Sequence, residues 1–119
     1  MKKIILGITI ILFCFLSLTF ADEADRQNSD YVSNPNKEAI KTSAGEVFGV
    51  TAIATASGGW VALYDVSSAS DITSSTEPKI EIAEATANNT GIKDFPEGLN
   101  FYNGIYVDGS NVKTVIYYR

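Results

Sequence analysis

The sequence contains no histidine in its 119 residues. This removes the commonest general base and the commonest neutral metal ligand, so serine–histidine and cysteine–histidine catalysis are excluded. The only cysteine is Cys14. It lies inside an N-terminal apolar run, and the rest of the chain therefore has no disulfide, thiol nucleophile or thiolate metal site.

Basic residues are also scarce. The chain has 9 Lys and Arg and 14 Asp and Glu, which gives a net charge of −5. An acidic surface repels phosphate backbones and anionic lipid headgroups. Nucleic acid is therefore not an expected partner. The same charge keeps a small domain soluble, and it is compatible with an assembly that depends on cations.

The first 21 residues have the pattern of a secretory signal peptide. Lys2 and Lys3 precede an apolar run over residues 4–15. In Thr19-Phe20-Ala21, small residues occupy the −3 and −1 positions that signal peptidase recognises. A membrane anchor is the alternative, but the run is shorter than the roughly 20 apolar residues of a span. We expect cleavage before Asp22 and a secreted, extracellular or cell-surface bacterial protein without a stable membrane anchor.

Residues 22–43 are mostly polar and charged, which predicts a flexible N-terminal extension. Only Tyr31, Val32 and Ile40 offer apolar anchors. We expect this extension to become ordered, if it does, by docking on another molecule.

Residues 44–119 predict an all-β domain, because apolar residues alternate with polar ones between recurring turn signals. Ser57-Gly58-Gly59 predicts a hairpin between the first two strands. For the third expected strand, residues 79–85, a helix is the alternative, because Glu and Ala favour helix formation. Strands about ten residues apart without helices between them predict a small antiparallel β-sandwich, jelly-roll-like or immunoglobulin-like. The expected strands cover residues 46–55, 60–66, 79–85, 99–107 and 112–118, with turn chemistry at 88–98 and 108–111.

Two segments carry a resemblance to a known group of proteins. The strand Trp60-Val61-Ala62-Leu63-Tyr64-Asp65 and the later stretch Asn103-Gly104-Ile105-Tyr106-Val107, in this order, resemble small β-sandwich proteins among phage virion components and related environmental proteins. The resemblance covers about residues 45–119. It implies a structural, assembly-type domain and assigns no functional residue. The signal peptide departs from that pattern and favours an extracellular or cell-surface structure.

Acidic residues near the predicted loops suit calcium, which prefers carboxylates and loop carbonyls. They are Asp65, Asp71, Asp94, Glu97 and Asp108. Asp also forms turns without any ligand, so both interpretations stay open. No carboxylate pair stands out for glycoside hydrolysis. We therefore expect no enzyme, and no cofactor other than calcium.

Aromatic residues occupy one face of the predicted strands. Trp60 and Tyr64 alternate with Val61 and Leu63, and Tyr102 and Tyr106 lie opposite Phe101 and Ile105. If the aliphatic set lines the core, the aromatic set forms an external strip that would stack on sugar rings or bury in a protein interface. The inverted assignment, with Trp60 in the core, stays open as well.

These observations lead to two functional hypotheses. The first is a self-assembling structural subunit of an extracellular fibre, sheath, tube or coat, in which the extension adds a strand to a neighbouring copy. Its contact residues would be Tyr31, Val32 and Ile40, together with the aromatic strip. The second is a carbohydrate- or ligand-binding module that uses the strip.

Overall fold

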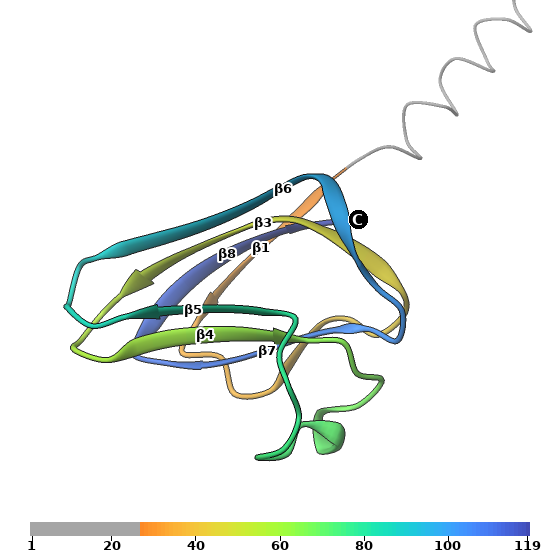
Figure 1. Ribbon diagram of the computed structural model, residues 1–119, viewed down its shortest axis with the longest axis horizontal. Helices are drawn as coiled ribbons and strands as arrows, with labels where there is room; N and C mark the ends of the chain where they lie inside the picture. The colour runs from red at the N-terminus through yellow and green to blue at the C-terminus, as the bar shows by residue number, and fades with distance from the viewer. Residues whose placement is uncertain (1–26) are drawn as a thin grey trace, which may run out of the picture.

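The computed structural model describes residues 27–119, so the predicted signal peptide lies outside the described part of the chain. Eight strands and one short 3-10 turn make up this part (Figure 1). They are β1 (Asn28–Ser33), β2 (Glu38–Lys41), β3 (Gly45–Ala54), β4 (Gly59–Tyr64), η1 (Ala69–Asp71), β5 (Ile80–Glu84), β6 (Thr90–Phe101), β7 (Ile105–Ser110) and β8 (Val112–Tyr118).

The strands form two packed antiparallel sheets, with orders β1-β8-β3-β6 and β2-β7-β4-β5 (Figure 1). The all-β sandwich expected from the sequence is confirmed. Each strand is followed by one in the opposite sheet, except that β4 and β5 are neighbours in the same sheet. Eight strands alternating between two sheets in this order are a jelly roll. The immunoglobulin-like alternative is excluded, because it pairs successive strands within a sheet.

The predicted hairpin between β3 and β4 is wrong, because the two strands belong to different sheets. Gly58 has φ +73° and supplies the turn, but that turn crosses from one layer to the other. Gly59 fits there because a side chain would collide with the Asn111 carbonyl at 2.5 Å. Local turn chemistry indicates that the chain reverses. It does not specify whether the reversal stays within one sheet.

A second correction concerns the predicted strand over residues 99–107, which is two strands in different sheets. β6 ends at Phe101 and β7 begins at Ile105. Most of the stretch expected to be turn, residues 88–98, is the first part of β6. Gly104 permits the crossing, since a Cβ there would lie 2.6 Å from the Val66 carbonyl oxygen.

Residues 28–41 belong to the sandwich and are not a flexible extension. β1 pairs with β8 from Asn28↔Tyr118 to Ser33↔Lys113, and β2 pairs with β7. Val32 is buried in the core between the sheets, and Ile40 packs against it. Both strands are polar because they are edge strands with one face open to solvent. The expected boundary between residues 43 and 44 therefore falls inside the domain.

The core lies between the two sheets and is formed by aliphatic residues and one phenylalanine. Val61 and Leu63 of β4 point into the core, so Trp60 lies on the opposite face of that strand. Of the two alternatives left open by the sequence, this is the one with the aliphatic residues in the core. The fully buried members include Val47, Val50, Val61, Leu63, Phe101, Ile105, Val107 and Ile116. Buried Thr114 is satisfied, because its hydroxyl donates to the Thr51 carbonyl at 3.0 Å.

Candidate functional site

The outer face of the β2-β7-β4-β5 sheet carries three members of the predicted aromatic strip. Tyr64 and Tyr106 are cross-strand neighbours, but both are buried, with 9% and 7% exposure. The connection between β4 and β5, which includes η1, lies on the outer side of this sheet (Figure 1). Ile72 of this connection packs against both tyrosines and covers them. These two tyrosines therefore form a second small core in this chain and not an open strip.

Two hydrogen bonds hold that connection in place, one from Tyr106 of β7 and one from Lys37, which directly precedes β2. The Tyr106 hydroxyl donates to the Ser67 carbonyl at 3.3 Å, and the Lys37 ammonium donates to the Ile72 carbonyl at 2.9 Å. Burial raises the pKa of the Tyr64 hydroxyl, and the carboxylates of Asp108 and Glu81 raise it further. Tyr64 therefore stays neutral and adds no charge beneath the connection.

Trp60 is only half-buried and lies in a surface depression at the end of the same face. The depression has a volume of about 570 Å³, and its other lining residues are Gly58, Gly59, Glu81, Ala83, Glu84 and Ala85. Because most of these side chains are small, they leave part of the indole accessible. The carboxylate of Glu81, which lies on the same face of the sheet as Trp60, adds a hydrogen-bond acceptor. A planar or ring-shaped ligand carrying donors would suit this place.

Tyr102, the fourth aromatic residue, is 72% exposed in the turn between β6 and β7. The Lys79 ammonium lies 4.8 Å from the centre of its ring. Tyr102 is therefore part of a different surface from Trp60. The structure does not bring the four predicted aromatic residues together.

Asp65, a calcium candidate, anchors the β6–β7 turn. Its carboxylate accepts hydrogen bonds from the backbone N–H groups of Tyr102 at 3.0 Å and Asn103 at 2.7 Å, and it lies 3.2 Å from the Lys79 ammonium. Burial acts to raise the pKa of this carboxyl, but the two N–H donors and Lys79 outweigh it, and the pKa lies below its usual value. Lys79 thus supplies the positive charge beside Asp65.

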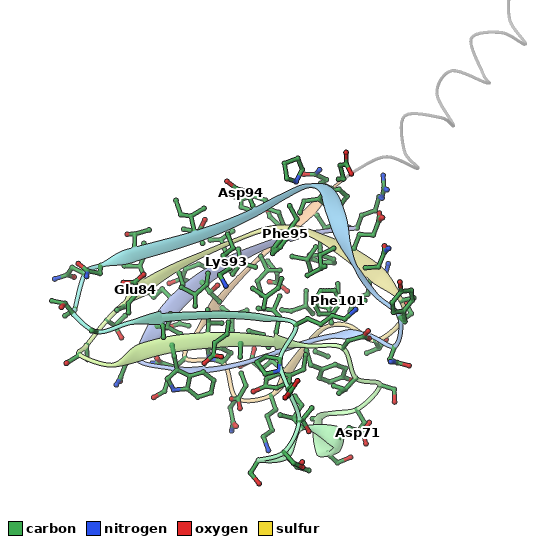
Figure 2. The ribbon with its side chains drawn as sticks, in the orientation of Figure 1. Asp71, Glu84, Lys93, Asp94, Phe95 and Phe101 are labelled. Carbon is green, nitrogen blue, oxygen red and sulfur yellow. The ribbon has the colours of Figure 1, made fainter. Side chains whose placement is uncertain are left out.

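Two of the other calcium candidates, Asp71 and Asp94, lie far apart on the domain (Figure 2). Asp71 accepts a hydrogen bond from the Ser67 hydroxyl at 3.3 Å, and Asp108 accepts one from the Gly109 N–H at 3.0 Å. Asp94 and Glu97 lie in β6. Within residues 27–119, no three Asp or Glu side chains gather into a group that could hold a metal ion. Calcium binding stays a prediction.

A surface that the sequence analysis missed covers the outer side of the β1-β8-β3-β6 sheet. Tyr31, Val115, Thr51 and Ile92 lie side by side across its four strands. Four side chains on this side are large, apolar and exposed: Tyr31 (60%), Ile53 (41%), Ile92 (62%) and Tyr117 (43%). We call this surface the apolar face and define it by Ser29, Tyr31, Ser33, Gly49, Thr51, Ile53, Thr90, Ile92, Asp94, Lys113, Val115 and Tyr117.

The sequence holds a weak signal for the apolar face. β3 and β8 carry apolar residues at both odd and even positions, which is unusual for strands with one solvated side. Of the three contact residues expected in the extension, Tyr31 lies on the apolar face. Val32 and Ile40 point into the chain's own core, where they are not available to a neighbour.

Neither a family model nor a curated protein matches this chain. Among solved structures, the coat protein of Tobacco streak virus is similar to it, with 13% sequence identity and a TM-score of 0.36 over 79% of this chain and 86% of that one. A likeness at this score supports neither a function nor a partner. The helical turn among residues 27–119 has three residues, and nothing in that range forms a helix suited to spanning a bilayer.

Proposed function

We propose that this protein is a secreted, non-enzymatic structural subunit that assembles with copies of itself. The apolar face carries the proposal. Contiguous exposed apolar side chains on a small domain mark a surface that another molecule covers. Here Tyr31, Ile53, Ile92 and Tyr117 share one side of one sheet. The N-terminal leader pattern supports export.

The contact we propose for this assembly is the apolar face and not an exchanged strand. β1 is hydrogen-bonded to β8 of its own chain, and Val32 fills that chain's own core. Strand exchange through residues 28–41 would first have to break these contacts. A contact between sheet faces is better suited to a coat or another layered assembly than to a fibre built by donated strands.

Analytical ultracentrifugation of the chain from Asp22 onward tests the proposal over a wide range of protein concentration. We expect a species larger than the monomer whose population grows with concentration. Ile92→Lys places a charge on the apolar face and should shift the protein to monomer. Ser75→Lys adds the same charge to the exposed β4–β5 connection and is the matched control. A wild-type protein that stays monomeric at every concentration would contradict the proposal.

The depression at Trp60 favours a second candidate function, binding of a neutral carbohydrate. An indole stacks on the apolar side of a sugar ring, and the carboxylate of Glu81 on the same face can accept hydrogen bonds from hydroxyl groups. Trp60 is the only tryptophan in the chain, so its fluorescence reports on this place alone. Titration with neutral oligosaccharides should change the emission if they bind there. An unchanged spectrum with every sugar would remove this candidate.

A further inference from the structure

We propose that two copies of this chain pack their apolar faces against each other around a two-fold axis, and that the sheet edges take no part in the contact. This inference rests on the proposed function and names its partner and geometry. The evidence comes from the edge strands, from the charge of the apolar face and from its size.

All four edge strands carry a charged residue on the side of the sheet that faces the other layer; Asp30 and Glu84 are partly buried there, whereas Lys93 and Glu38 are exposed at the rim. Residues directly opposite each other in a ladder share a face of the sheet. Each of these charged residues lies opposite a buried residue of the neighbouring strand. The pairs are Asp30↔Ile116 on β1, Lys93↔Val50 on β6, Glu38↔Val107 on β2 and Glu84↔Gly59 on β5.

The β5–β6 side shows the consequence of this arrangement. Figure 2 shows Lys93 on the side of β6 that faces the second layer, Asp94 on the outer side, and Glu84 between the layers. A Cβ on Gly91 would lie 2.7 Å from a carboxylate oxygen of Glu84, which confirms that this side chain reaches across the gap. An added strand would enclose such charges in a continuous core. Inward charges on edge strands are a known protection against edge-to-edge pairing.

β6 has a further protection. Its pairing with β3 shifts register between Val47 and Gly49, and the strand contains Pro96, which has no N–H to donate. A regular ladder therefore cannot continue along its full length. Since the edges are protected, a growing sheet is disfavoured and a contact between faces remains.

The charge of the apolar face fits a second copy of the same face. Its 12 residues include one basic side chain, Lys113, and one acidic side chain, Asp94, so its net charge is zero, while the chain carries −5. Two acidic chains repel each other over most orientations. The apolar face is a place where two copies can meet without that repulsion.

The size of the apolar face predicts a weak pair. Four strands about 4.8 Å apart and a seven-residue β8 give a flat footprint of about 19 by 23 Å on each copy. This is smaller than the roughly 800 Å² per partner of a standard stable interface. The pair should therefore form in a concentration-dependent way. A two-fold contact is closed, so any larger assembly needs a second surface.

Cross-linking tests this geometry. Thr51 lies near the centre of the apolar face, and Cys14 belongs to the predicted leader, so Thr51→Cys in the chain from Asp22 onward provides one thiol per copy. A short bismaleimide should join this variant into covalent dimers in high yield. Ser75→Cys, in the β4–β5 connection, is the matched control and should give few. Adding Ile92→Lys to the Thr51→Cys variant should abolish the cross-link, with circular dichroism confirming that the sandwich is intact.

The possible results separate the inference from the proposed function. A wild-type chain that is monomeric at all concentrations, with no cross-link at position 51, overturns both. A wild-type chain that assembles while position 51 stays unlinked and Ile92→Lys has no effect leaves self-assembly standing as the function. It overturns the face-to-face pair and the assignment of the assembly contact to the apolar face. Cross-linking at position 75 equal to that at position 51 also overturns it, because the contact would then be non-specific.

Discussion

Tyr31 and Val32 are neighbours in β1 that lie on opposite sides of the sheet, so changing each in turn separates folding from assembly. Val32 is 7% exposed and belongs to the core, whereas Tyr31 is 60% exposed on the apolar face. We expect Val32→Ala to destabilise the monomer and Tyr31→Ser to leave the monomer's stability almost unchanged while weakening self-association.

The magnitude for Val32→Ala follows from the groups removed. Two methyl groups leave the core, at about 0.8 kcal/mol each for lost burial, and the residual cavity adds to this. We expect a loss of about 2 kcal/mol in the free energy of unfolding. Tyr31→Ser removes a mostly solvated side chain, for which about 0.5 kcal/mol or less is expected.

Urea unfolding at low protein concentration, followed by Trp60 fluorescence, measures both values, because dilution removes the contribution of self-association. The same two variants are then compared by ultracentrifugation at high concentration. A Val32→Ala variant as stable as the wild type would refute the docking of β1. It would restore the interpretation of residues 22–43 as a flexible extension.

Three further predictions concern the turns and the domain boundary. Asp65→Asn should cost about 1–3 kcal/mol at neutral pH, because a carboxylate that accepts two N–H groups is lost. The pKa of Asp65 is lower in the folded state than in the unfolded state. The carboxylate therefore contributes its full stabilisation above the unfolded pKa of about 3.9, and this contribution disappears as the pH falls through the folded-state pKa. In acid denaturation, the stabilities of wild type and Asp65→Asn should converge at that low pH. Gly59→Ala should lower the melting temperature, since its Cβ would lie 2.5 Å from the Asn111 carbonyl oxygen, while Gly58→Ala, with open space around it, should show only the smaller cost of its positive φ. Deleting residues 22–41 should abolish folding, as seen by circular dichroism, because it removes two strands; a folded, monomeric product would contradict this.

The strand character of most of the domain could be predicted from the sequence, since alternation along a strand is a local property. The segments that became β3, β4, β5 and β8 were located within a few residues, and β5 is a strand and not the competing helix. The same alternation put Val61 and Leu63 on the face opposite Trp60 but left open which face is buried, and the structure places Val61 and Leu63 in the core. The absence of histidine excluded whole classes of catalysis without any structure.

The candidate site was less predictable, because it depends on which segments become neighbours. Tyr64 and Tyr106 alternate with core residues as an external strip would, yet the β4–β5 connection covers them. Ile53 and Ile92 look unremarkable in the sequence and become one surface only when β3 and β6 pair.

The sequence by itself determined the acidic charge, the limits on chemistry, the β class and the approximate positions of four strands. The tertiary structure alone decided which sheet each strand joins, that β1 and β2 complete the sandwich, and that an apolar face remains uncovered. The physical reason is distance along the chain. Asn28 pairs with Tyr118 through backbone hydrogen bonds between nearly opposite ends of the described residues, and no local pattern in either segment encodes that pairing.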